Sequence, residues 1–197
     1  MVFVVAADER RRSDLVATLH SMNFRHEAYS GLEEFLENFA EERPGCVILD
    51  AASCVDSLNS LTPKADDPRL PPVIFITDDV DVGLIVRAMR SGAVDFLFRR
   101  SYSESELWEA IQSGLSRDEK NRAEQAERRE RLRRLSLLTA VEREVLDLLL
   151  AGKNNRQISE QTGATRGSIE ARRARVMKKL GVPHLPALIR FAVAAEI

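Results

Sequence analysis

The segment from Thr139 to Val182 restricts the possible fold more than any other part of the sequence, because it contains the start and stop signals of three short helices. Thr139 and Glu142 have the spacing of a capping box, in which both side chains accept hydrogen bonds from backbone amides at the start of a helix. Gly152 supplies the left-handed residue that commonly ends a helix. Between these signals, apolar residues recur at helical spacing: Val141, Val145, Leu148 and Leu149. The pattern predicts an amphipathic helix beginning near Ala140.

Two more short helices are predicted after it, separated by Gly163. Asn155 can cap the second helix, and Thr165 can cap the third. Two helices joined by a tight glycine turn form a helix-turn-helix. One face of the third helix is apolar, with Ile169, Val176 and Leu180, and the other is largely basic, with Arg172, Arg173, Arg175, Lys178 and Lys179. Such a basic face suits the phosphates of DNA.

Three motifs in this region resemble the LuxR-type four-helix DNA-binding domain. They are Leu-Thr-x-x-Glu-Arg-Glu-Val-Leu at 138–146, Gly-Lys-x-Asn-Arg-Gln-Ile at 152–158 and Arg-x-Arg-Val-Met-Lys-Lys-Leu-Gly-Val at 173–182. The simpler alternative is a small helical bundle whose basic residues are only a solvated face. So many matched positions in one order argue against that alternative. The resemblance implies that the chain binds double-stranded DNA.

The resemblance also assigns roles to residues of the third helix. Base-facing positions fall on Glu170, Ala171 and Ala174, where members of the family often carry Lys, Val and Lys. Glu170 could accept a hydrogen bond from cytosine, or it could only stabilise the helix dipole. Arg172 or Arg173 could take over base contacts. The remaining DNA-binding candidates are Lys153, Asn155, Arg156, Thr165, Arg166, Ser168, Arg175, Lys178 and Lys179.

The charge distribution divides the 197 residues into unlike parts. Residues 1–115 contain 11 Lys and Arg against 20 Asp and Glu, whereas residues 136–197 contain 10 against 6. We therefore expect an acidic domain over 1–115, a charged helical linker over 116–135 and a basic domain over 136–197.

The linker sequence favours a helix that continues the last helix of the first domain. It contains neither Pro nor Gly, and acidic residues precede basic ones by four positions in three pairs, Glu124 and Arg128, Glu127 and Arg131, and Glu130 and Arg134. Apolar residues are too sparse over 116–131 for a coiled coil of three heptads, so a solvated spacer is the preferred interpretation.

The composition excludes several classes of protein. No apolar run reaches 18 residues, and Val2–Ala7 is too short for a signal peptide, so we expect a cytoplasmic protein without a membrane segment. Cys46 and Cys54 are expected to be buried thiols, because a metal site would need more ligands. The three histidines have no nucleophile or ligand set at a meaningful spacing, so we expect no enzyme.

The first 115 residues alternate strands with helices, which is typical of an α/β fold with a parallel sheet. Apolar runs predict strands at Val2–Val5, Cys46–Leu49, Val73–Thr77 and Val94–Phe98, with a weaker one near Arg25–Tyr29. Amphipathic stretches predict helices at about 9–22, 31–42, 81–91 and 103–115. The arrangement is flavodoxin-like. Residues at the carboxyl ends of the strands, Ala6, Ala7, Asp50, Thr77 and Arg99, are therefore expected to converge.

Three sequence segments within residues 1–115 are similar to receiver domains of two-component systems, most of all to the FixJ subfamily of the NarL/FixJ type. They are Arg-Pro-Gly-Cys-Val-Ile-Leu-Asp at 43–50, Pro-Val-Ile-Phe-Ile-Thr at 72–77 and Val-Arg-Ala-Met-Arg-Ser-Gly-Ala-Val-Asp-Phe-Leu at 86–97. A receiver followed by a LuxR-type domain is the architecture of a response regulator that controls transcription. The resemblance covers essentially the whole chain.

The residues that the family uses for phosphorylation are altered here. Asp50 matches the phosphate-accepting aspartate, but Ala6 and Ala7 stand where the family has two acidic ligands of Mg²⁺. A methyl group cannot ligate a cation that requires oxygen. Arg99 replaces the family's lysine, and Asp78, after the matched Thr77, adds a negative charge that opposes an incoming anion. We expect a degenerate receiver that binds no Mg²⁺ and requires no other cofactor.

Two residues of this pocket have more than one interpretation. Asp8 could reach back to a weak metal site, although capping the first helix is the favoured role. Arg99 could form an ion pair with Asp50 in place of metal and phosphate, or it could point to solvent. In the segment after Asp50, Pro63 and the prolines that follow limit any further helix to roughly Val55–Leu61.

The sequence is compatible with more than one dimer surface and more than one function. A homodimer could form through the receiver, where Phe96 matches the family's switch aromatic or is ordinary core, or through the last helix at about Leu185–Ala195. The leading hypothesis is a transcription regulator that works without phosphorylation, with an unknown protein as a possible regulator. The alternatives are an interaction module that binds DNA weakly and a residual phosphoacceptor at Asp50.

Overall fold

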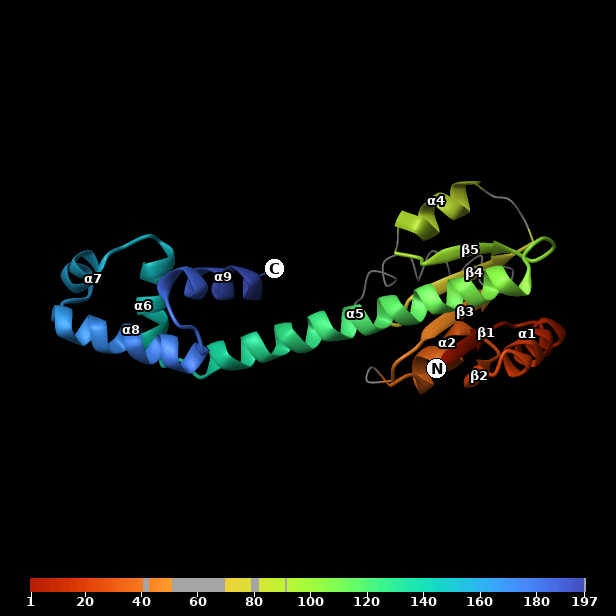
Figure 1. The fold of residues 1–197 in the computed structure, drawn as a ribbon, viewed down its shortest axis with the longest axis horizontal. Helices are drawn as coiled ribbons and strands as arrows, with labels where there is room; N and C mark the ends of the chain where they lie inside the picture. The colour runs from red at the N-terminus through yellow and green to blue at the C-terminus, as the bar shows by residue number, and fades with distance from the viewer. Residues whose placement is uncertain (41–42, 51–69, 79–81, 91, 197) are drawn as a thin grey trace. The chain divides into compact units, whose positions relative to one another are not determined.

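The structure of the protein, a computed structural model, describes residues 1–40, 43–50, 70–78, 82–90 and 92–196 (Figure 1). The chain divides into two compact units, Met1–Ala123 and Glu124–Ile197. The short helix predicted at Val55–Leu61 and the thiol of Cys54 lie outside the described residues.

The first unit contains the five-stranded parallel sheet that the apolar runs predict. Its strands are β1 Val2–Val5, β2 His26–Tyr29, β3 Cys46–Asp50, β4 Val73–Thr77 and β5 Asp95–Phe98, in the order β2-β1-β3-β4-β5. All four strand pairs are parallel. The flavodoxin-like fold class is confirmed, including the weak second strand.

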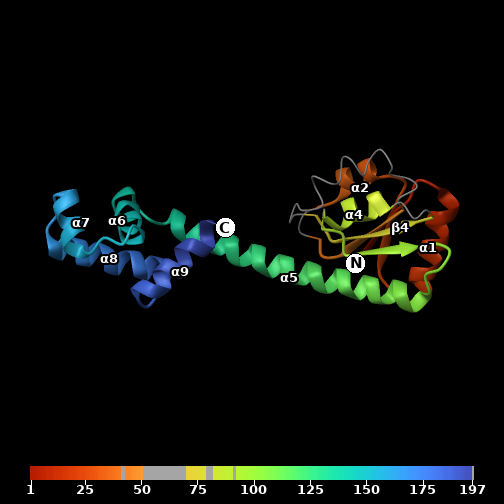
Figure 2. The same ribbon diagram turned by 90° about the horizontal axis from the view of Figure 1, so that it is seen from above.

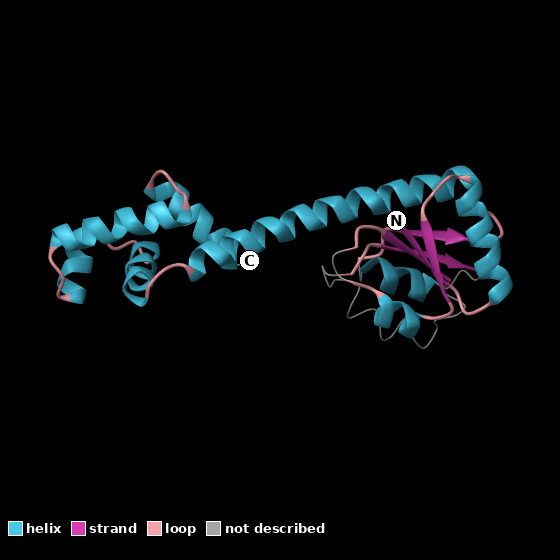
Figure 3. Cartoon of the chain, turned by 90° about the horizontal axis from the view of Figure 1, so that it is seen from below, coloured by secondary structure: helices cyan, strands magenta, loops and turns pink. Residues whose placement is uncertain are grey.

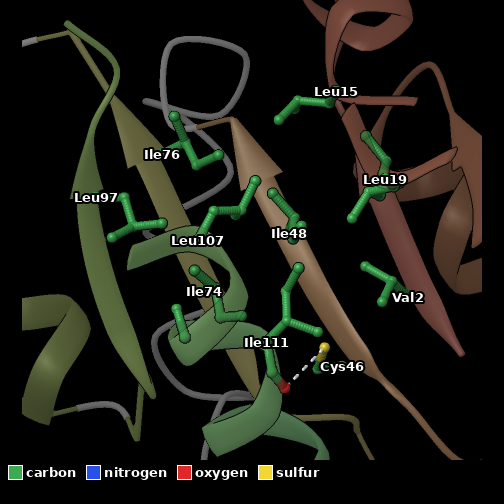
Figure 4. Close-up of a cluster of buried hydrophobic side chains, with 12 residues drawn as sticks. Val2, Leu15, Leu19, Cys46, Ile48, Ile74, Ile76, Leu97, Leu107 and Ile111 are labelled. Carbon is green, nitrogen blue, oxygen red and sulfur yellow. Dashed lines mark hydrogen bonds between the residues drawn. The ribbon is translucent and has the colours of Figure 1, made fainter. Parts of the chain in front are cut away.

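Helices cover both faces of this sheet (Figures 2 and 3). The helix α1, Glu9–Ser21, and the first part of α5, Glu104–Ser136, pack on one face. The helices α2, Leu32–Asn38, and α4, Val82–Arg90, belong to the other face. Figure 4 shows part of the core beneath α1 and α5, where Cys46 is a buried free thiol whose pKa is raised by burial to about 12.

As the linker sequence predicts, the last helix of the receiver continues through residues 116–135, so that α5 runs without a break to Ser136. The carboxylate of Asp118, which is 5% exposed, accepts hydrogen bonds from the backbone amide of Gly45 at 2.9 Å and from Nε of Arg122 at 2.8 Å. Arg122 also donates to the carbonyl oxygen of Arg43. These bonds hold α5 to the turn before β3. The compact unit therefore includes α5 as far as Ala123.

The second unit is a helical domain. The end of α5 is followed by α6 Ala140–Leu150, α7 Asn155–Thr162, α8 Arg166–Leu180 and α9 Leu185–Glu196 (Figure 1). Their core contains Leu135, Val145, Leu146, Leu149, Ile158, Ile169, Val176, Leu180 and Leu188. The helical fold of this region is confirmed.

Most of the predicted helix signals are present. Thr139 and Glu142 form the capping box, Thr165 caps α8 through the amide of Ser168, and Gly163 has a φ of 68°. The predicted cap of α7 was wrong by one residue. Asn154 is the cap, because its side chain and that of Gln157 can exchange hydrogen bonds with each other's backbone amides.

The apolar face predicted for α6 also needs one correction. Val145 and Leu149 are buried as expected, but Val141 is 43% exposed. The buried position in the first turn is instead taken by the acidic Glu142.

In the described part of the chain, no helix is both long enough and apolar enough to cross a membrane.

Candidate DNA-binding surface and receiver pocket

Among the residues that the structure describes, four charged side chains meet at the carboxyl edge of the receiver sheet. Asp50 is the last residue of β3, Asp78 follows β4 and Arg99 follows β5. The fourth, Arg11, comes from the first turn of α1. Parallel strands bring their carboxyl ends to one edge, which explains the convergence of the first three.

These side chains form a network in which each carboxylate contacts both guanidinium groups. Arg99 Nη2 lies 3.0 Å from Asp50 Oδ1, and Arg99 Nε lies 3.4 Å from Asp78 Oδ1. Arg11 Nη2 lies 2.8 Å from Asp78 Oδ2, and Arg11 Nη1 lies 3.5 Å from Asp50 Oδ2. We call these four residues the charge quartet. Its formal charges, two positive and two negative, cancel.

Burial makes this cancellation necessary. The Asp50 side chain is fully buried, whereas Arg99 is 20% exposed and Asp78 is 29% exposed. A buried charge is costly unless it is paired. The buried Nε and Nη2 of Arg99 make no aligned hydrogen bond to the described residues, so its contacts with the carboxylates are ion pairs. The predicted pairing of Arg99 with Asp50 is present, and the alternative in which Arg99 points to solvent is wrong.

Arg11 is the member that the sequence analysis missed. Burial alone would lower the pKa of its guanidinium, but the charges of Asp50 and Asp78 outweigh burial and raise the pKa. A signal was available in the sequence. Three consecutive arginines, Arg10 to Arg12, lie in the first turn of α1, where the helix dipole disfavours positive charge. Two of these arginines have partners outside α1: Arg11 contacts Asp50 and Asp78, and Arg12 donates to the carbonyl oxygen of Ala6 at 2.7 Å.

Ala6 and Ala7 lie next to this pocket at the end of β1. The Ala6 side chain is fully buried, and Ala7 is exposed. Asp8 caps α1, because its carboxylate accepts a hydrogen bond from the amide of Arg11 at 2.8 Å. Its favoured structural role is thus confirmed. Among the described residues, no three His, Cys, Asp or Glu side chains are grouped as metal ligands.

The remaining receiver candidates lie on neighbouring strands. Thr77 is buried at the end of β4, and its carbonyl oxygen accepts a hydrogen bond from the amide of Arg99 at 2.8 Å. Phe96 in β5 is partly buried and stacks on Phe75, with ring centroids 5.5 Å apart. Phe96 therefore belongs to the core packing beneath α4.

In the second unit, α8 buries one face and exposes the other. Ile169, Val176 and Leu180 are fully buried. The three base-facing candidates, Glu170, Ala171 and Ala174, are all exposed, as are Thr165, Arg166, Ser168, Arg175 and Lys178. The surface that would face DNA is thus formed by residues that are free to approach it.

Two shallow grooves flank this exposed row. One gathers the candidates Lys153, Asn155, Arg156, Arg166, Glu170 and Arg173 from α7, α8 and the turn before α7. The other gathers Ser168, Ala171, Arg172 and Arg175 beside the start of α6. The structure therefore brings most of the predicted DNA-binding residues together on two sides of one helix.

Among the described residues, three of the basic candidates are engaged within the protein. Arg156 Nε donates to Glu160 Oε1 at 2.9 Å within α7. Arg173 Nη1 donates to Asn155 Oδ1 at 2.8 Å, which joins α8 to α7. Lys179 Nζ lies 2.6 Å from Glu142 Oε2, and it donates to the carbonyl oxygen of Leu137 at 3.0 Å. Lys179 follows the buried Val176 by three residues, so its helical position already placed it at the edge of the apolar face.

Comparisons with known proteins agree with this arrangement. Residues 136–192 match the family of bacterial regulatory proteins described as the luxR family. Nodulation protein W of Bradyrhizobium diazoefficiens is 30% identical over 195 residues, an alignment that covers 98% of this chain and 85% of that protein. The chain belongs to the FixJ-type response regulators.

Other relatives extend the likeness over the full length. The transcriptional regulatory protein FixJ of Bradyrhizobium diazoefficiens is 29% identical over 195 residues, with 98% of this chain and 95% of that protein covered. The solved structure of the response regulator StyR matches with a TM-score of 0.77 at 32% identity, covering 98% of this response regulator and 97% of StyR. Full-length FixJ from B. japonicum matches with a TM-score of 0.54 at 28% identity, covering 99% and 96% of the two chains.

The charge quartet leads to a prediction about the stability of the response regulator. Arg99→Met should lower the free energy of unfolding of the receiver by about 3 kcal/mol, because it leaves the buried Asp50 with one cation fewer. Chemical denaturation followed by circular dichroism measures this change. Arg100→Met is the matched control, since Arg100 is exposed and adjacent. Equal effects of the two substitutions would contradict a stabilising role for the quartet.

Proposed function

We propose that this response regulator controls transcription by binding double-stranded DNA through α8, and that its receiver operates without Mg²⁺-dependent phosphorylation. The single observation that supports the second part is the charge quartet. Both oxygens of the Asp50 carboxylate lie within ion-pair distance of a guanidinium. The carboxylate that the family phosphorylates is thus already engaged by the protein's own cations.

The residues of the pocket do not fit Mg²⁺. Mg²⁺ requires oxygen ligands in nearly octahedral geometry, and carboxylates usually provide them. Ala6 and Ala7 offer only methyl side chains, and Asp8 is occupied as a helix cap. The positive charges of Arg11 and Arg99 would also repel a cation close to Asp50.

Phosphorylation would also disturb the charge balance. A phosphoryl group carries a charge of about −1.5 to −2 near neutral pH, whereas the Asp50 carboxylate carries a single negative charge. Without a divalent cation, the added negative charge would be repelled by the Asp78 carboxylate. Asp78 already forms ion pairs with the same two arginines, Arg11 and Arg99. The quartet therefore takes the place of metal and phosphate in this proposal.

Treatment with Mg²⁺ and acetyl phosphate tests the proposal directly. We expect no adduct on the intact protein, because the side chains of Ala6 and Ala7 cannot ligate Mg²⁺ and Asp50 is paired with Arg11 and Arg99. Mass spectrometry of the intact chain provides the measurement, with an Asp50→Asn variant as the control. A stable adduct that forms on the wild-type protein and is absent from Asp50→Asn would refute phosphorylation independence.

DNA binding is the second part of the proposal. The exposed basic residues on both sides of α8 and the luxR family match support it. A homodimer formed through the receiver or α9 would suit a palindromic site. Both surfaces expose large apolar side chains: Met89 and Trp108 on α4 and α5 of the receiver, and Ile189 and Val193 on α9. We further propose a cytoplasmic protein without enzymatic activity, whose receiver responds to a regulatory protein.

The alternative is an interaction module that binds DNA weakly, and the exposed Glu170 among basic residues favours it. Gel shifts on genomic fragments at several salt concentrations distinguish the two, because phosphate contacts make affinity fall with salt. We expect salt-dependent binding of selected fragments by the wild-type protein.

We also expect Glu170→Lys to raise affinity for all fragments, since it replaces a negative charge that DNA repels with a positive charge that DNA attracts. Absence of binding would favour the module, and an unchanged affinity of Glu170→Lys would remove this residue from the interface.

A further inference from the structure

The C-terminal turn of α8 is held by cations on two sides. Arg134, near the end of α5, donates from Nη1 to the carbonyl oxygen of Leu180 at 3.2 Å. This carbonyl belongs to the last residue of α8, and the final carbonyls of a helix lack partners within the helix. A cation at this end also interacts favourably with the helix dipole. The end of α5 therefore binds the end of α8 directly.

The second contact joins α8 to the start of α6. The Lys179 ammonium lies 2.6 Å from the Glu142 carboxylate and 3.0 Å from the carbonyl oxygen of Leu137. The same carboxylate accepts hydrogen bonds from the amide and hydroxyl of Thr139 at 2.9 and 3.0 Å. Lys179, followed by the Thr139 amide, lowers the pKa of Glu142 to about 2. A buried, ionised Glu142 thus serves both as helix cap and as partner of Lys179.

The end of α8 lies close to Arg134. Gly181 ends α8 with a φ of 69°, and a Cβ atom built on it would lie 3.0 Å from Arg134 Nη1. Leu135 and Leu180 both belong to the core of this unit. Polar contacts and core packing therefore both fix the C-terminal end of α8 to the C-terminal end of α5.

We propose that Arg134 and Lys179 are positioning residues, which set the placement of α8 through Leu180 and Glu142 and do not contact DNA phosphate. This inference rests on the proposed DNA binding by α8. It assigns different roles to adjacent lysines: Lys178 is exposed and contacts phosphate, whereas Lys179 fixes the helix that presents it. It also makes the end of α5 part of the structure that orients the recognition helix.

Salt dependence of DNA affinity separates the two roles. Each lost phosphate contact should reduce the slope of log affinity against log salt by about 1, whereas loss of a positioning contact leaves the slope unchanged. We expect Lys178→Met to reduce the slope and to leave thermal unfolding unchanged. Lys179→Met should keep the slope, weaken binding at every salt concentration and lower the melting temperature. A slope reduced by Lys179→Met as much as by Lys178→Met would overturn the proposal.

Two further comparisons keep the result interpretable. For the full chain, Glu142→Gln and Lys179→Met should have non-additive effects on the melting temperature, because they remove the same contact. Arg134→Met should speed amide exchange in the last turn of α8, whereas Arg133→Met, which loses only its pair with Glu130, should not. Additive effects on the melting temperature would refute the positioning role of Lys179. Equal rates of amide exchange in both arginine variants would refute that of Arg134. Because these readouts need no DNA, they stay informative even if the wild-type protein fails to bind it.

Discussion

A buried carboxylate at the end of β3 determines how the receiver pocket is built. Asp50 is fully buried, and its charge is compensated by one arginine from α1 and one from the end of β5. The two arginines together carry two positive charges, and Asp78 balances the one that Asp50 does not. The network therefore joins α1 to three strand ends. In our proposal, the quartet stands where the resemblance to receivers places a metal ion and a phosphoryl group.

The second unit shows similar pairing, because the buried Glu142 carboxylate and the terminal carbonyl of α8 each have a cationic partner. Glu142 caps α6 and binds Lys179, and Arg134 satisfies the terminal carbonyl of α8. These contacts orient the helix whose exposed side carries the DNA-binding candidates. In our proposal, DNA binding and helix positioning depend on basic residues that are close together in sequence but face different surroundings.

The sequence was sufficient to predict the elements but not all of their side-chain contacts. Apolar runs located β1, β3 and β4 within one residue at each end, because strands buried on both faces have a strong compositional signal. The capping box at Thr139 is local and was equally predictable. The partners of Arg11 and Lys179 were not predicted because they are distant in the chain, and helical spacing gives only the direction of a side chain. The cap of α7 was displaced by one residue because two asparagines are adjacent.

In our proposal, the charge quartet excludes Mg²⁺ from the receiver. A titration with Mg²⁺ alone, followed through the amide chemical shifts of the receiver in NMR spectra, measures this most directly. We expect no saturable shift at Asp50, Thr77 or Arg99, and we expect the side-chain signals of Arg11 and Arg99 to persist. A saturable shift at these residues, abolished by Asp50→Asn, would show that a metal site has survived and would contradict the exclusion of Mg²⁺.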